Sequence, residues 1–353
     1  MTDQEQKVGE GALAIQGGRD VQINQGMSAS DVQAIISALG QQMLVPAYAQ
    51  IARAVVEERL ADFELKLLER FASDASARPE AFAEPDFQAT VVTAQRAHAR
   101  SGDDGVRDVL VDLIARRSTE IGRSRLSLSL NQAVEKAALL THEEFAALSL
   151  CYLAKYTKVQ VPDYAKFVAH LRDCWTPFVS EVPRGSSVFA YLQAQGCAGQ
   201  GALSQQLHKL FSNLYAGVVA TGVDLQTFVN ATDTSRVDSL VEMKLLIPCF
   251  HDRTKWQVGA LNKAQFDEEA KKKGLSPEVV EKVWSVFAPS VWDATAMPEK
   301  LAMDVPEMRQ LFDLWAPSGL AGATLTSVGI AIAHASIGRR AKTFDANLSI
   351  WIK

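Results

Sequence analysis

The chain has 353 residues, 48% of them hydrophobic and 22% charged, and its formal net charge at pH 7 is −5. This is the composition of a globular protein with enough apolar residues for a buried core, in two domains or one large helical domain. The negative net charge excludes a protein that holds nucleic acid through a global basic field, although it leaves room for a local basic patch.

Residues 12–24 form a strand pattern near the start of the chain. Apolar residues alternate with small or polar ones on both sides of a Gly-Gly turn, namely Leu13, Ile15, Val21 and Ile23. A two-stranded hairpin is marginal in water, and its open edges seek further strands. We therefore expect residues 1–27 to be a β-hairpin arm that joins copies of the chain into a homo-oligomer. The alternative is that the arm pairs within its own chain, with residues 348–352.

Almost all of the chain after residue 28 has the apolar spacing of amphipathic helices. Such stripes must be buried against other elements, so they predict a helix bundle. The clearest helices are expected near residues 47–73, 103–117, 142–156, 202–219 and 305–316. The fold class is therefore mainly α, a multi-helix bundle. A stretch at 183–201 that is rich in Gly, Ser and Gln divides it into helical domains at 28–182 and 183–353.

Two segments near the end of the chain have distinct patterns. Residues 319–338 contain no Asp, Glu, Lys or Arg and approach the length of a membrane span. Their content of Gly, Ala, Ser and Thr favours a core helix or a strand-to-helix turn instead, and we expect no membrane span. The tail alternates apolar Leu348, Ile350 and Ile352 with other residues, which predicts a C-terminal strand docked on the body.

The six histidines and four cysteines show no metal-ligand spacing, and no nucleophile motif occurs. The sequence therefore predicts no cofactor, no metal and no enzymatic activity, although a site assembled from residues distant in the sequence stays open. The cysteines are expected to be reduced thiols of a cytoplasmic protein without a secretory leader. They are Cys151, Cys174, Cys197 and Cys249.

Two basic clusters are the candidates for contact with an anion or with nucleic acid. The first follows a predicted helix end and comprises Arg116, Arg117, Arg123 and Arg125. The second follows the apolar C-terminal segment and comprises Arg339, Arg340 and Lys342. The alternative is that these cations sit at helix ends, where positive charge complements the helix dipole.

Several short stretches carry family resemblances. Residues 17–23, Gly-Gly-Arg-Asp-Val-Gln-Ile, resemble the start of an uncharacterised family of bacterial proteins. Four others resemble the Abi-alpha (abortive infection) helical family, namely Glu84–Phe87, Asp108–Leu113, Leu139–Leu150 and Leu325–Gly329. In that family a Leu-rich helix and a terminal Leu-Thr-x-x-Gly segment look like parts of a winged helix, and here Leu240–Ile247 would be the helix. About 80 residues separate the two pieces in this chain, so the winged helix it implies is a degenerate one.

These observations predict a non-enzymatic, oligomer-forming interaction protein whose first partner is another copy of itself. The resemblance implies a bacterial phage-defence role, in which the protein senses a viral component or acts as a toxic scaffold, with a phage or host protein as partner. The alternative function is a nucleic-acid-binding regulator that uses a winged-helix-like C-terminal region.

Overall fold

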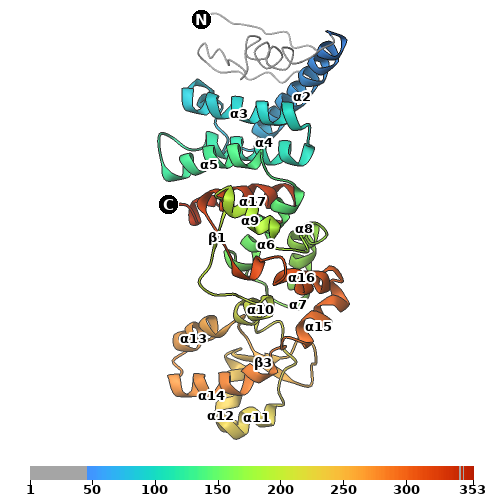
Figure 1. Ribbon diagram of the computed structural model, residues 1–353. Helices are drawn as coiled ribbons and strands as arrows, with labels where there is room; N and C mark the ends of the chain where they lie inside the picture. Colours follow the sequence, from blue (N-terminus) through green and yellow to red (C-terminus); the bar gives the residue numbers. More distant parts are fainter. Residues whose placement is uncertain (1–45, 342, 345) are drawn as a thin grey trace, which may run out of the picture. The chain divides into compact units, whose positions relative to one another are not determined.

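The computed structural model describes residues 46–341, 343–344 and 346–353 (Figure 1). The predicted arm with Leu13, Ile15, Val21 and Ile23 lies outside the described residues, and so does Lys342. The described chain is mostly helical, so the mainly α fold class is confirmed.

Two compact units make up the described chain, and each contains discontinuous segments. Unit 1 comprises the described residues up to His142, Ser327–Arg339 and Ala346–Lys353. Unit 2 comprises Glu143–Thr326 and the described residues of Arg340–Asp345. This division differs from the predicted domains 28–182 and 183–353. The stretch rich in Gly, Ser and Gln lies inside unit 2, where it contains helix α9 and strand β1. Its composition does not identify a domain boundary, because surface loops within a domain and linkers between domains share it.

Unit 1 is helical throughout its described residues. Its elements are α2 (Pro46–Ser73), the 3₁₀ helix η1 (Pro79–Ala83), α3 (Pro85–Ser101), α4 (Asp104–Ser118), α5 (Arg125–Ala137), α17 (Ser327–Arg340, all but its last residue) and the 3₁₀ helix η5 (Leu348–Ile350). Side-chain caps start α4 and α5. Asp103 accepts a hydrogen bond from the backbone N–H of Val106, and Ser124 forms a capping box with Ser127.

The core of unit 1 contains the stripes that the sequence predicts. Phe63 and Leu67 of α2 and Leu110 and Leu113 of α4 are all buried. The sequence therefore identified the inward faces of these two helices correctly, because residues three and four apart share one face of an α-helix.

The C-terminal tail is not the strand that its alternation predicts. Leu348–Ile350 is a 3₁₀ helix that starts where the Asn347 side chain accepts a hydrogen bond from the N–H of Ser349. Leu348 and Ile352, four residues apart, are buried, whereas Ile350 between them is exposed. The tail is thus docked as expected, but a turn of helix rather than a strand buries its ends.

Unit 2 combines short helices with two small antiparallel sheets. Its helices are α6 (His142–Lys155, all but its first residue), α7 (Tyr164–His170), the π-helix η2 (Leu171–Trp175), α8 (Thr176–Val179), α9 (Ser187–Ala194), α10 (Leu207–Tyr215), α11 (Leu225–Ala231), α12 (Thr234–Glu242), α13 (Lys263–Lys272), α14 (Pro277–Phe287), η3 (Ala288–Ser290), α15 (Ala296–Asp304), α16 (Glu307–Trp315) and η4 (Leu320–Gly322). Strand β1 (Ala198–Gln200) pairs with β4 (Ala323–Leu325), and β2 (Leu246–Pro248) pairs with β3 (Trp256–Val258).

The segment considered for a membrane span contains η4, β4 and most of α17, whose residues Val328–Ile337 are buried. A strand followed by a core helix is the alternative that its composition favours. Among the described residues, no helix combines the length and the apolar character that crossing a bilayer requires.

Candidate functional site

The first predicted basic cluster is largely occupied with contacts inside unit 1. Arg116 Nε lies 2.6 Å from Asp112 Oδ2. The buried Arg117 donates to Asp86 Oδ2 at 2.8 Å and to the side-chain oxygen of Asn131 at 2.9 Å. Arg117 therefore joins α4 to α3 and α5, whereas the pair of Arg116 with Asp112 lies within α4. The other two members of the cluster, Arg123 and Arg125, are exposed.

The second basic cluster does not form one surface. Arg339 belongs to unit 1, where its Nη2 lies 3.2 Å from Asp108 Oδ2. Arg340 belongs to unit 2, where it lies 2.8 Å from Glu181 Oε2 and 5.1 Å from the ring centre of Phe178. Four of the seven predicted cations thus contact a carboxylate of their own unit, which leaves Arg123 and Arg125 as the exposed candidates for anion contact.

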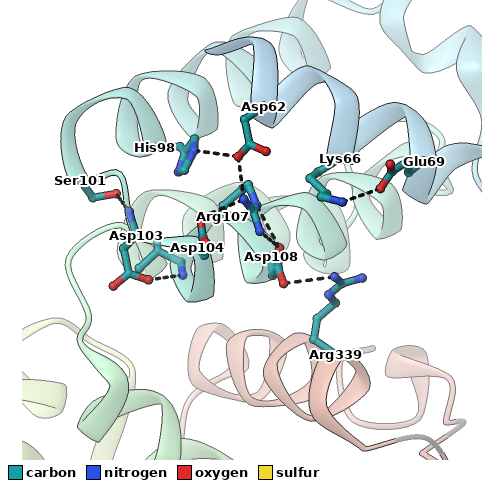
Figure 2. Close-up of polar contacts among 11 residues, drawn as sticks. Asp62, Lys66, Glu69, His98, Ser101, Asp103, Asp104, Arg107, Asp108 and Arg339 are labelled. Atoms are coloured by element: carbon teal, nitrogen blue, oxygen red, sulfur yellow. Dashed lines mark hydrogen bonds and ion pairs between the residues drawn. The ribbon is translucent and has the colours of Figure 1, made fainter. Parts of the chain in front are cut away.

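A network of charged side chains joins helices α2, α3, α4 and α17 in unit 1 (Figure 2). Arg107 is at its centre, with Nη1 2.6 Å from Asp62 Oδ2 and 2.9 Å from Asp104 Oδ1, and Nη2 3.0 Å from Asp108 Oδ1. Asp108 in turn contacts Arg339. The hydrogen bond from Arg107 lowers the pKa of Asp62, so this carboxylate stays ionised.

His98 is the buried histidine of this network, with 1% of its surface exposed. Its Nε2 lies 3.5 Å from Asp62 Oδ2, and neither ring nitrogen has a hydrogen bond within the part of the chain that the structure describes. Burial and, after it, the positive charge of Arg107 lower the pKa of His98. The imidazole is therefore held neutral next to an ionised carboxylate. No sequence motif marks this group, apart from the run of Asp and Arg residues at the start of α4.

Residues 223–258 of unit 2 have the element order of a winged helix. Helices α11 and α12 are joined by two residues, and the β2–β3 hairpin follows α12 directly. Val223 and Trp256 exchange two backbone hydrogen bonds of 2.8 Å, so β3 lies between residue 223 and β2. A helix–turn–helix followed by a hairpin, with a third short strand beside it, is the winged helix arrangement.

A shared core confirms that this segment packs as one body. Each of its elements contributes a buried side chain to the same hydrophobic cluster, namely Phe228, Val237, Leu240, Leu246 and Val258, which α14 also joins through Val283. Figure 1 shows α11, α12, β3 and α14 close together within unit 2.

This arrangement corrects the predicted winged helix in two respects. Leu240–Ile247 is not one helix, because α12 ends at Glu242 and the chain turns at Lys244, whose φ is 56°. The backbone N–H of Leu245 then bonds the carbonyl of Leu240, which closes the helix and starts β2. In addition, the Leu325–Gly329 segment is not the wing, because β4 pairs with β1.

The winged-helix segment has no excess of positive charge: the charges balance within Leu225–Val258, and Asp224 before it adds one more acid. Between Leu225 and Val258 there are four basic and four acidic residues: Arg236, Lys244, Arg253 and Lys255 against Asp233, Asp238, Glu242 and Asp252. Three of the four acids lie on or next to α12, the helix that corresponds to a recognition helix, and Arg236 is its one cation. The exposed surface of α12 is therefore polar and not basic.

The β2–β3 loop of this segment is docked on other parts of unit 2. The ring of His251 lies 4.3 Å from the ring centre of Tyr164 and 4.6 Å from that of Trp292. Its Nε2 lies 2.9 Å from the carbonyl oxygen of Val218. This side of the wing is consequently occupied by protein contacts.

The four cysteines are free and buried, as the sequence predicts. Burial raises the pKa of Cys151 to about 12 and that of Cys174 to about 11, so both thiols stay protonated and poorly nucleophilic at neutral pH. No group of three His, Cys, Asp or Glu side chains suited to a metal ion occurs within residues 46–341, 343–344 and 346–353.

Lys155 of α6 makes three hydrogen bonds within unit 2. Its Nζ donates to the carbonyl oxygens of Leu320, Ala321 and Ala323 at 2.8, 3.0 and 2.7 Å. Because all three ammonium protons are used, Lys155 ties the segment before α17 to α6 and has no lone pair to offer as a base.

A protein-family model matches residues 26–352, which is most of the chain. The chain therefore belongs to this family, whose function is not established. Comparison with curated proteins and with solved structures finds no match. The Abi-alpha resemblance stays a prediction, because the family match carries no link to it.

Proposed function

We propose that the protein is a non-enzymatic interaction protein whose winged-helix-like segment, Leu225–Val258, docks on another protein. One observation carries this proposal, namely the balanced charge of that segment. Proteins that grip duplex DNA do so largely with Lys and Arg on phosphates, and about 6–10 such contacts are common. Four cations set against four acids supply far less, whereas a neutral polar surface suits a protein partner.

Self-association through the N-terminal arm is part of the same proposal. Its support is the strand pattern of residues 12–24, with Leu13, Ile15, Val21 and Ile23 as the contact residues. The role in phage defence rests on the Abi-alpha resemblance alone. Both elements fit an interaction protein, in which a partner-binding segment gains avidity when several copies are joined.

A nucleic-acid-binding regulator is the second candidate, and the element order of residues 223–258 favours it. In helix–turn–helix proteins the N-terminal residues of the second helix contact base edges. Here these are the exposed Thr234, Ser235 and Arg236. Arg236 would then be the main contact to a base or a phosphate.

Fluorescence anisotropy with a labelled DNA duplex of about 30 base pairs separates the two candidates. The assay uses the full chain at 50 and 200 mM salt, with Arg236→Glu and a control, Arg309→Glu, on the exposed face of α16. The interaction proposal predicts no saturable binding, or weak binding that both variants reduce equally. Tight binding that falls at least a hundredfold with salt and is lost selectively in Arg236→Glu would establish the regulator instead.

Light scattering tests self-association separately. The expected result is a multiple of the monomer mass that is lost on deletion of residues 1–27 and in the double change Val21→Asp with Ile23→Asp. The matched control is Gln22→Asp with Asn24→Asp, which adds the same charge at the alternate positions of the arm. A monomeric wild type, or a mass that neither the deletion nor the double change alters, would refute the oligomer.

A further inference from the structure

We propose that His98 is a proton-operated catch, which holds helix α2 on α3 and α4 while its ring is neutral and releases α2 when the ring is protonated. His98 lies on α3, and its nearest charged neighbour is Asp62 on α2 (Figure 2). The group thus sits at the junction of the helices that it would control.

The carboxylate that would accept a hydrogen bond from the protonated His98 ring already accepts one from Arg107. Asp62 Oδ2 is 3.5 Å from His98 Nε2, outside hydrogen-bond distance, and 2.6 Å from Arg107 Nη1 of α4. A protonated ring has to compete with Arg107 for this oxygen. Either outcome leaves one buried cation with a poorer partner, and the desolvation cost of such a cation is large.

The other charges around His98 do not remove the conflict. Asp104 of α4 favours the protonated ring, whereas Arg59 of α2 and Arg107 of α4 oppose it. The side chain of Arg59 donates to the carbonyl of Ala99, so it is held close to the end of α3. Two fixed guanidinium groups therefore face the ring together with two carboxylates, and burial decides in favour of the neutral form.

Helix α2 is the element that can leave. It packs on the rest of unit 1 through one face, which carries Val56, Leu60 and Phe63. Apolar side chains on other faces are exposed, including Tyr48, Ile51 and Leu65. A helix held along one face opens locally at a lower cost than global unfolding.

The direction of the pH effect follows from linkage. A histidine whose pKa is lowered on folding binds its proton more readily when the helix is released, so stability is full above the ordinary pKa of about 6.5 and falls as the pH drops below it. Between pH 7.5 and 5.0, one such histidine can raise the equilibrium constant for the release of α2 by at most about thirtyfold. Burial raises the pKa of the partly buried Glu64 of α2, so its protonation strengthens the folded form and cannot cause the loss.

Hydrogen–deuterium exchange of peptides from Pro46–Ser73, corrected for intrinsic exchange rates, tests the catch in the full chain. The expected result is a loss of protection between pH 7.5 and 5.0 of at least about threefold in wild type, and none in His98→Gln. The control is His142→Gln, a histidine of unit 1 whose side chain is half exposed and paired with Asp103, and it should behave as wild type.

Three results would overturn the proposal: a wild-type α2 whose protection does not change with pH, an equal loss in His98→Gln, or a loss abolished by His142→Gln. If His98→Gln does not fold, NMR titration of the His98 ring in wild type decides. A midpoint clearly below 6.5 supports the catch, and a midpoint at or above 6.5 refutes it.

Discussion

The two units differ in what joins their helices. In unit 1, ion pairs beside the apolar core cross from helix to helix, such as Arg107 with Asp62 and Arg117 with Asp86. In unit 2 the centre is aromatic, and the ring of Phe211 lies within 6.1 Å of the rings of Phe167, Trp175, Tyr215 and Phe312. Aromatic packing stabilises a fold through the apolar area that it buries. Ion pairs fix the relative positions of two helices, but removing their charges from water costs free energy. Unit 1 should therefore respond to pH and salt, and unit 2 to changes in packing.

The largest expected effect is in the aromatic centre. Phe211→Ala removes a ring that is almost fully buried and should lower the stability of unit 2 by about 3–5 kcal/mol. Urea denaturation followed by tryptophan fluorescence measures it, because five of the six tryptophans lie in unit 2. The control is Leu203→Ala at an exposed site. Equal midpoints for the two variants would show that the aromatic centre is not what stabilises unit 2.

The matching change in unit 1 is Asp112→Ala. The buried Asp112 carboxylate accepts from Arg70 at 3.0 Å and from Arg116 at 2.6 Å. Its loss leaves two partly buried guanidinium groups without this partner and should cost about 2–4 kcal/mol, with Asp112→Asn intermediate. Hydrogen exchange of α2 and α4 peptides measures the effect. Asp313→Ala, which removes an exposed pair with Arg309, should change little. A loss no larger than in that control would contradict the ionic view of unit 1.

Lys155→Met tests whether a polar tie also matters in unit 2. The change removes three charge-assisted hydrogen bonds to carbonyl groups but keeps most of the side-chain volume. We expect a loss of about 2–3 kcal/mol, measured by the same fluorescence assay. Lys158→Met, on an exposed position, is the control. An unchanged midpoint in Lys155→Met would mean that water replaces the lysine without cost.

Acid should also lower the global stability of both units, through His170 in unit 2 and His334 in unit 1, in addition to the local effect of His98 on α2. Burial lowers the pKa of His170 in unit 2 and of His334 in unit 1 to about 4. Stability is full above the ordinary pKa of about 6.5 and falls as the pH drops from there toward 4, by about 2 kcal/mol per histidine at pH 5. His170→Gln and His334→Gln should each shrink the difference in unfolding free energy between pH 7 and pH 5. An undiminished difference in both variants would rule these groups out.

The smallest effect is expected from the backbone of the winged-helix segment. Lys244 adopts the left-handed conformation, with a φ of 56°. Lys244→Gly should stabilise the segment by up to about 1 kcal/mol, because glycine adopts this conformation without a Cβ clash. Asp238→Gly, at an exposed position in the middle of α12, is the control and should destabilise it. Denaturation midpoints measure both, and a lower midpoint for Lys244→Gly would contradict the expectation.

The sequence predicted the helices and their inward faces because the spacing of apolar residues along a helix is a local property of the sequence. Leu110 and Leu113 of the α4 stripe are buried as expected. The prediction of a C-terminal strand was wrong, because alternation over five residues cannot distinguish a strand from a turn of 3₁₀ helix. The two pieces expected for a winged helix, Leu240–Ile247 as its helix and Leu325–Gly329, were both wrong. The observed hairpin could not be predicted because β2 and β3 are three residues long and their pairing depends on contacts that no period shows. His98 was missed because its significance comes from Asp62 and Arg107, on other helices.

The interleaving of the two units along the chain has a consequence for biosynthesis. Residues of unit 2 interrupt unit 1 between His142 and Ser327, so α17 is made about 180 residues after the helices with which it shares a unit. At ribosomal speeds this delay is on the order of 10–40 s. During that time α2 to α5 have no α17 to pack against, and the ion pair between Asp108 and Arg339 cannot form. The nascent chain therefore completes unit 2 almost entirely before unit 1, and the N-terminal helices are the last to reach their final packing.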